Sequence, residues 1–148
     1  MARVSLELPE TFLFITELAV RVTDINFAGH VGNDTLLSLL QEARSRFLAH
    51  YGLKDLDLFG LGMVITDAVV VYQSEAFHGD TLSIAVTVQD FNKYGCDFVY
   101  QVTEQRSGRA VARAKTGMVF FDYRERRVQP VPAPFLALFG AVTVPASG

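Results

Sequence analysis

The sequence predicts an α+β domain in which one long helix is wrapped by a curved antiparallel sheet of five strands. Three observations lead to this prediction. A single long stretch, between residues 33 and 52, has the apolar spacing of a helix. Five other stretches are rich in β-branched and aromatic residues, and short turn signals join the last four. No internal repeat or long linker interrupts the sequence, so we expect one domain over residues 1–148.

The first strand is predicted over residues 13–23, LFITELAVRVT, because this stretch is aliphatic and β-branched. It ends in the turn-prone segment 24–33, DINFAGHVGN. A helix should follow, with Gly52 as its stop signal. Asn33 or Asp34 is expected to cap this helix, since a short side-chain oxygen can accept the free amides of a first turn.

The predicted helix, of about 18 residues, has one apolar stripe. Its members recur at steps of three and four residues, so they lie on the same side of the helix. We expect this side to pack against the sheet. The stripe consists of Leu36, Leu40, Ala43, Phe47 and Tyr51.

Four more strands are expected, at residues 63–73, 81–89, 96–104 and 109–122. From Leu82 to Val88, apolar residues alternate with small or polar ones, as in a half-buried antiparallel strand. The turn signals HGD, FNKYG and RSG are short, so neighbouring strands should pair antiparallel. One helix wrapped by such a sheet is the hotdog arrangement, and the edges of its sheet stay open to a partner subunit.

The composition sets further limits. Hydrophobic residues make up 50% of the chain, but no apolar run reaches the roughly 20 residues that a membrane-spanning helix needs. The first residues show no export signal, so we expect a cytoplasmic protein without membrane contact.

Cys96 is the only cysteine, which excludes an internal disulfide, and its strand-like surroundings favour a core position. The basic residues after position 90 are spread along strands and turns, which argues against nucleic acid and suits a small anionic ligand or a solvated face.

Several common catalytic motifs are absent from the sequence. No serine lies in G-x-S-x-G, no glycine-rich phosphate loop precedes a helix, and the histidines are too far apart to suggest a zinc site. Polar residues instead gather between the first strand and the helix, where free amides and the positive end of the helix dipole can polarise a carbonyl. They are Asp24, Asn26, His30, Asn33 and Asp34.

The segment D-I-N-F-A-G-H-V-G-N at 24–33, followed by Q-E-A-R at 41–44, resembles the 4-hydroxybenzoyl-CoA thioesterase-like family. That family typically has D-x-D-x-x-G-H-V-N-N and then E-E-A-R at the same spacing. Gly79-Asp80 and G-M-V-F-F-D, ending at Asp122, extend the similarity from residue 15 to residue 130.

This resemblance implies a hotdog-fold hydrolase of acyl-CoA or acyl carrier protein thioesters. Coenzyme A would be part of the substrate, with no cofactor and no metal. The resemblance also implies a homodimer or homotetramer with its active site at a subunit interface. The backbone amide near Asn33 would be the oxyanion donor.

Asn26 departs from the family pattern, because many members have a catalytic Asp at this position, four residues before the histidine. An amide cannot act as a base or nucleophile. In one reading, Asn26 and His30 orient the thioester or a water, while Glu42 on the helix supplies the carboxylate, as in another hotdog lineage. In a second reading, Asp24 is the carboxylate. In a third, the site binds acyl groups without hydrolysing them, or serves another chemistry.

A rival enzyme class is the hotdog enoyl hydratase, which pairs an Asp with a His five residues later. His30 lies six residues after Asp24 and four after Asn26, so the spacing disfavours this class.

Each candidate also has a structural alternative. Glu42 precedes Arg46 by four residues, the spacing of an ordinary surface ion pair. It projects roughly 140° from the centre of the apolar stripe, so it should face solvent or another subunit. Asp24 could instead accept turn amides, His30 could be a polar filler of its turn, and Arg44 at the flank of the stripe could brace Asp24 or another carboxylate.

The substrate-binding candidates are Asn33 and Asp34 at the helix start, with Lys93 and Arg113 as partners for the phosphates of CoA. A solvated role is the alternative for both cations. Four aromatic residues are candidates either for the walls of an acyl pocket or for the core: Tyr72, Phe77, Tyr94 and Phe98.

Overall fold

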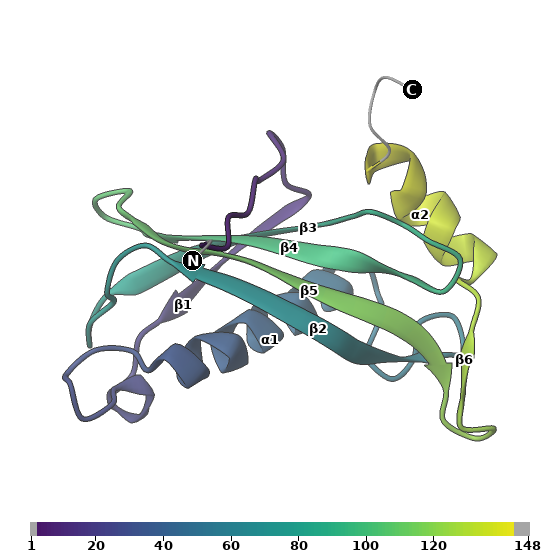
Figure 1. The fold of residues 1–148 in the computed structure, drawn as a ribbon, viewed down its shortest axis with the longest axis horizontal. Coiled ribbons are helices and arrows are strands. Elements are labelled where there is room, and N and C mark those ends of the chain that lie inside the picture. Colours follow the sequence, from purple (N-terminus) through teal and green to yellow (C-terminus); the bar gives the residue numbers. More distant parts are fainter. Residues whose placement is uncertain (1–2, 144–148) are drawn as a thin grey trace.

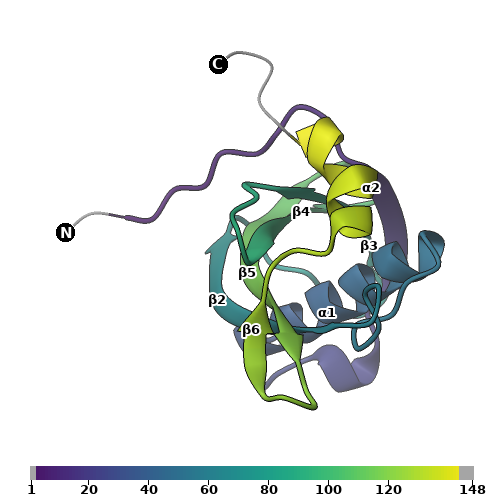
Figure 2. The ribbon, with the colours of Figure 1, turned by 90° about the vertical axis from the view of Figure 1, so that its right-hand side faces the viewer.

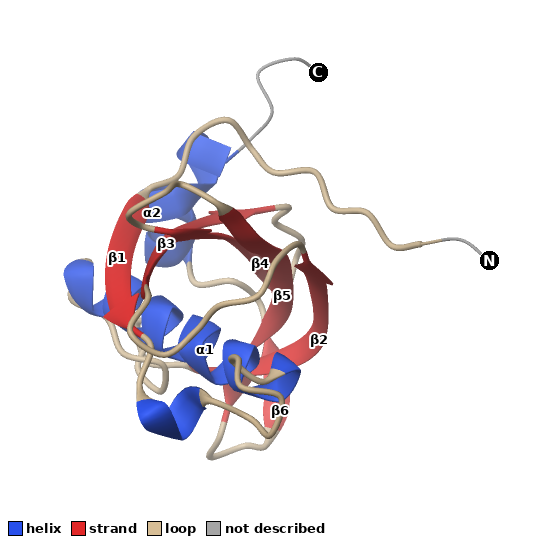
Figure 3. Cartoon of the chain, turned by 90° about the vertical axis from the view of Figure 1, so that its left-hand side faces the viewer, coloured by secondary structure: helices blue, strands red, loops and turns tan. Residues whose placement is uncertain are grey.

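The computed structural model describes residues 3–143. One long helix, α1 (Asn33–His50), lies within a sheet that curves around it (Figures 1 and 3). A short 3₁₀ helix (Val22–Asp24) follows the first strand, and a second α-helix, α2 (Ala133–Thr143), lies at the end of the described chain. The strands are β1 (Phe14–Ala19), β2 (Gly62–Tyr72), β3 (Thr81–Gln89), β4 (Gly95–Glu104), β5 (Ala110–Asp122) and β6 (Arg127–Gln129).

The strand order across the sheet is β1-β3-β4-β5-β2, and every neighbouring pair is antiparallel. The predicted hotdog arrangement is therefore confirmed. The four strands predicted after the helix agree with β2 to β5 to within one residue at each end. Turn signals and apolar alternation determine these bounds, because both act locally along the chain.

Within residues 3–143 the sheet has six strands instead of the predicted five. The additional strand, β6, pairs with the end of β5, where Phe120 lies opposite Gln129. The turn between them is held by the Asp122 carboxylate, which accepts the backbone amides of Arg124 at 2.8 Å and Glu125 at 3.1 Å.

The first strand is shorter than predicted, since it ends at Ala19 instead of continuing to residue 23. The buried Asp24 carboxylate accepts the backbone amide of Arg21 at 2.8 Å and folds the following residues into the 3₁₀ turn. A side-chain acceptor thus competes with the extended backbone that the β-branched composition predicts.

The predicted apolar stripe of α1 forms the centre of the core. Leu36, Leu40, Ala43 and Phe47 are buried, and Tyr51 packs against them at the helix end. The stripe faces the inner residues of the sheet, where the Phe47 and Phe98 rings meet edge to face at 5.9 Å. The predicted span of the helix is confirmed.

Helix α2 was not predicted, and it packs beside the C-terminal end of α1 (Figure 2). Its residues Phe135 and Phe139 lie one turn apart and are buried. The Phe135 ring contacts Phe120 at 4.9 Å, and the Phe139 ring contacts Phe47 at 5.5 Å. The helix therefore extends the same hydrophobic core.

Strand β2 forms one edge of the sheet and pairs only with β5 within residues 3–143. It is 11 residues long, and its middle residues, including Ile65 and Ala68, are exposed. A long apolar edge strand carries a row of backbone groups that can pair with another chain.

No helix within the described residues has the length and apolar character needed to cross a membrane. The segment before β1 runs above the outer side of the sheet (Figures 2 and 3). There Arg113 of β5 donates a hydrogen bond to the Leu6 carbonyl at 3.0 Å.

Candidate active site

The polar segment between β1 and α1 forms a closed loop. Ile25 and Val31 face each other as an antiparallel bridge, and the amide of Asn26 donates to the His30 carbonyl at 2.9 Å. Gly29 allows the reversal of the chain, because its φ of 86° lies in the left-handed region. This loop places His30 directly before the helix start.

The start of α1 differs from the prediction. Gly32 is the N-cap, and no side chain within residues 3–143 caps it, so neither Asn33 nor Asp34 has the expected capping role. A side chain at Gly32 would meet Asp34 Oδ1 at 2.6 Å, so the backbone here is closely surrounded. The first amides of α1 therefore have no capping side chain, which leaves them available to an external acceptor.

A cavity of about 390 Å³ opens beside this helix start. Its walls come from the loop before α1, the first turn of α1, the end of β2 and the segment that follows β2. The lining residues are His30, Val31, Gly32, Asn33, Leu36, Tyr72, Gln73, Ser74, Glu75, Ala76 and Val111. We call this cavity the His30 pocket.

Tyr72 links β2 to the helix start, because its hydroxyl donates a hydrogen bond to the Asn33 carbonyl at 2.7 Å. Burial raises the pKa of the Tyr72 hydroxyl, and the nearby Asp34 carboxylate adds to this rise. The hydroxyl therefore stays protonated and keeps its donor role.

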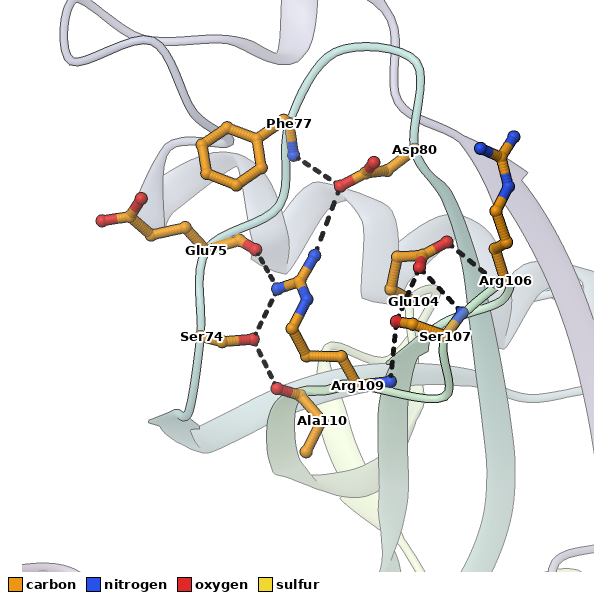
Figure 4. Close-up of polar contacts among 9 residues, drawn as sticks. All are labelled: Ser74, Glu75, Phe77, Asp80, Glu104, Arg106, Ser107, Arg109 and Ala110. Atoms are coloured by element: carbon orange, nitrogen blue, oxygen red, sulfur yellow. Dashed lines mark hydrogen bonds and ion pairs between the residues drawn. The ribbon is translucent and has the colours of Figure 1, made fainter.

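The segment after β2 is fastened by Arg109, which precedes β5 (Figure 4). Arg109 Nη1 donates to Ser74 Oγ at 2.7 Å and to the Glu75 carbonyl, and Nη2 forms an ion pair with Asp80 at 3.6 Å. The Asp80 carboxylate also accepts the amide of Phe77 at 2.9 Å. These contacts fix the pocket wall that carries Glu75.

His30 has two polar neighbours. Its Nδ1 lies 3.1 Å from the Val31 carbonyl, and its Nε2 lies 3.9 Å from Glu75 Oε1. The amide of Val31 donates to the Ala76 carbonyl at 2.8 Å, which joins the His30 loop to the segment after β2.

Asp24 and Asn26, the two candidates that precede His30 in the loop, have structural partners. The Asp24 carboxylate is buried and bonded to Arg21, so the prediction that it accepts turn amides is confirmed. The Asn26 side-chain oxygen accepts the Ala28 amide at 3.0 Å, and Asn26 does not line the His30 pocket.

Glu42 lies in a different hollow, between α1 and β1, which also includes Asp24. Its carboxylate pairs with Arg46 at 2.7 Å, as the four-residue spacing predicts. Arg46 is held in turn by the Thr16 hydroxyl and the Glu17 carbonyl. Within one chain the structure does not bring Glu42 to the His30 pocket.

The two predicted phosphate ligands also lie elsewhere. Lys93 lies between β3 and β4, where its carbonyl accepts the amide of Val131 at 3.0 Å just before α2, and its ammonium group lies 5.3 Å from the centre of the Tyr94 ring. Arg113 lies on the outer side of the sheet and holds Leu6. Neither lines the His30 pocket within one chain.

Arg44 braces a different partner from the predicted carboxylate. Its guanidinium is buried and donates to the Tyr100 hydroxyl at 3.0 Å. The Tyr100 hydroxyl also lies 2.8 Å from the Thr116 hydroxyl. Burial raises the pKa of Tyr100, so the hydroxyl stays neutral beside the cation. Arg44 thus links α1 to the centre of the sheet.

Glu75 and Arg109 were not predicted as parts of the pocket. Both lie far from His30 along the chain, in turn segments without periodicity. Of the four aromatic candidates, Tyr72 lines the pocket and Phe98 lies in the core. Phe77 and Tyr94 are exposed within one chain.

The chain is similar to known proteins over most of its length. The model of the thioesterase-like superfamily matches residues 20–139. A 1,4-dihydroxy-2-naphthoyl-CoA hydrolase of Synechocystis sp. is 27% identical over 127 residues, which cover 82% of this chain and 91% of that protein.

Solved structures show the same fold. A 1,4-dihydroxy-2-naphthoyl-CoA thioesterase from Synechocystis has a TM-score of 0.79 at 23% identity, covering 89% of this chain and 98% of its own. A gentisyl-coenzyme A thioesterase has a TM-score of 0.73 at 19% identity, with 82% and 98% covered. A probable thioesterase from Escherichia coli has a TM-score of 0.72 at 21% identity, with 83% and 93% covered.

The superfamily model spans the helix start, the His30 pocket and most of the sheet. The chain therefore belongs to the thioesterase-like superfamily and has its hotdog fold.

Proposed function

We propose that the protein hydrolyses acyl-CoA thioesters in the His30 pocket. One observation carries this proposal: the pocket combines an uncapped helix start, a histidine and an apolar wall. The uncapped amides can bind the oxyanion that forms when water attacks a thioester carbonyl. Superfamily membership supports the same reaction class.

The acyl group is proposed to be aromatic. Val31, Leu36, Ala76 and Val111 supply apolar surface, and Tyr72 adds an aromatic ring at the end of β2. The relative at 27% identity is a hydrolase of an aromatic acyl-CoA. CoA is proposed over acyl carrier protein as the carrier of the acyl group, on the basis of the same relative. Water is the only other reactant, so the proposal includes neither a cofactor nor a metal.

The assembly is proposed to be a homodimer that pairs two β2 strands. The free edge of β2 can continue the sheet into a second copy, which also covers its exposed apolar residues. The earlier hypothesis that Glu42 supplies the carboxylate requires such a second subunit, because Glu42 and the His30 pocket lie apart within one chain. A role of Lys93 or Arg113 at the phosphates of CoA also requires a second subunit, because neither residue lines the His30 pocket within one chain.

The test is release of free CoA from a panel of aromatic and aliphatic acyl-CoA thioesters, followed with a thiol-reactive chromophore. We expect aromatic thioesters to give a kcat/KM at least about tenfold above that of a medium-chain aliphatic thioester, the scale of discrimination by an apolar pocket. The same acyl group on acyl carrier protein should react more slowly. Tight binding of acyl-CoA without CoA release would contradict hydrolysis and favour an acyl-binding protein.

A further inference from the structure

Glu75 is the one carboxylate among the described residues that line the His30 pocket. Its side chain is 61% exposed, and its oxygen Oε1 lies 3.9 Å from His30 Nε2. Asn26 carries an amide and lies outside the pocket, and Glu42 lies in the other hollow. A single chain therefore brings one acidic group to the proposed site of hydrolysis, and that group faces the histidine.

The ring of His30 is oriented by its other nitrogen. A carbonyl oxygen can only accept a hydrogen bond, so the contact with Val31 requires the proton on Nδ1. In the neutral ring, Nε2 then carries the free lone pair and faces Glu75. This arrangement suits a base whose cationic form is stabilised by a neighbouring carboxylate.

The wall that carries Glu75 is held independently of its side chain. Arg109 bonds the Glu75 carbonyl, Ser74 and Asp80, and none of these contacts involves the Glu75 carboxylate (Figure 4). The carboxylate is thus presented from a fixed backbone, and exchanging it for an amide leaves the Arg109 contacts intact.

We propose that His30 Nε2 is the general base of the reaction and that Glu75 is a positioning residue that stabilises the imidazolium. This inference rests on the proposed thioesterase function. Water attacks the acyl carbon as its proton passes to Nε2, and the oxyanion forms on the amides at the start of α1. When the intermediate collapses, the carbon–sulfur bond breaks and Nε2 returns the proton to the sulfur of CoA. The products are a free acid and CoA, so all atoms balance.

Other charged groups near His30 are few. From α1, Asp34 acts on Tyr72, whose hydroxyl is committed to Asn33. From the start of β5, Arg109 reaches the opposite side of the Glu75 segment and is paired with Asp80. Among the described residues, Glu75 is the acidic group that lies within 4 Å of His30 Nε2.

The experiment compares Glu75→Gln with Glu125→Gln in the full-length protein. Glu125 is an exposed, ion-paired carboxylate in the β5–β6 turn, remote from the pocket, so it controls for the same chemical change. We expect Glu75→Gln to lower kcat at least about tenfold with little change in KM, and His30→Gln to lower it about a hundredfold. Glu125→Gln should match the unaltered protein.

A second measurement does not depend on turnover. The His30 ring is observed by NMR at one fixed pH, and its signal is assigned by its loss in His30→Gln. The signal should move in Glu75→Gln, because the ring has lost a neighbouring carboxylate, and stay in place in Glu125→Gln. An unmoved signal, or a Glu75→Gln enzyme with full kcat while Glu42→Gln is inactive, would overturn the proposal. A protein that shows the moved signal but releases no CoA would instead overturn the proposed function.

Discussion

At the scale of single residues, burial determines the chemistry of the Cys96 thiol. Cys96 is 2% exposed. Burial, together with the neighbouring Asp97 carboxylate, raises the pKa of its thiol far above the usual range. The thiolate is the reactive form, so a thiol that stays protonated and buried is inert. The predicted core position of Cys96 is confirmed.

We expect native protein to show no reaction of Cys96 with a thiol-reactive chromophore over the minutes of a CoA-release assay. One thiol per chain should react after unfolding in guanidinium chloride. The check is absorbance of the released chromophore, with a Cys96→Ala variant as the blank. Rapid labelling of the folded protein would contradict the buried position.

Residue-level predictions succeeded where the partners lie close in sequence. The Glu42–Arg46 pair follows from a four-residue spacing on a helix, and the turn role of Asp24 from its place after a strand. The cap prediction was wrong, because Gly32 begins the helix through its backbone alone. Glu75 could not be found, since only tertiary folding brings it to His30.

At the scale of elements, α2 contributes more to the core than its position near the chain end indicates. Phe135 is completely buried and contacts Phe91, Phe120 and Phe139. Truncating such a ring removes apolar contacts and leaves a cavity. The helix therefore contributes to the stability of the whole domain.

We expect Phe135→Ala to lower the free energy of unfolding by about 3–5 kcal/mol. Leu136→Ala, at the next position of the same helix, is the control, because Leu136 is 47% exposed. Its effect should stay within about 0.5 kcal/mol. Both values come from chemical denaturation followed by circular dichroism, and equal effects would show that α2 does not dock as described.

The elements differ in how far the sequence predicts them. Strands β2 to β5 follow from β-branched composition and short turns, and α1 follows from its apolar stripe. Helix α2 has no polar face in its stretch APFLALFGAVT, so it lacks the amphipathic period on which a helix prediction depends. The four-residue step from Phe135 to Phe139, after a proline in the first turn, is the signal that could have found it.

At the scale of the whole molecule, the open edge of β2 is the main feature that a single chain leaves unsatisfied. The order of elements was sufficient to predict the hotdog fold, because one helix and an antiparallel sheet allow few arrangements. The edge strand could not be identified in advance. Strand β2 pairs with β5 and not with the next strand in sequence, and this pairing depends on the tertiary fold of the whole sheet.

We expect Ala68→Lys, at an exposed position in the middle of β2, to weaken the proposed dimer at least about tenfold, or roughly 1.4 kcal/mol. A lysine on an edge strand opposes pairing with another edge. Gln101→Lys, at an exposed position of the interior strand β4, is the control and should leave the assembly unchanged. Light scattering after size-exclusion chromatography gives the mass of each variant, and an undiminished dimer in Ala68→Lys would contradict assembly through β2.

The pairing of β2 with β5 also has a consequence for folding. It joins residues distant in the chain, such as Gly62 and Phe121, whereas β3, β4 and β5 are joined by short turns. Distant pairing costs more loop entropy, so we expect the three-strand meander to form first and β2 to join afterwards. The His30 pocket needs the end of β2 as one of its walls, so a partly folded chain has no complete site. Recovery of CoA release during refolding would then report the pairing of β2 with β5, which follows the formation of the three-strand meander.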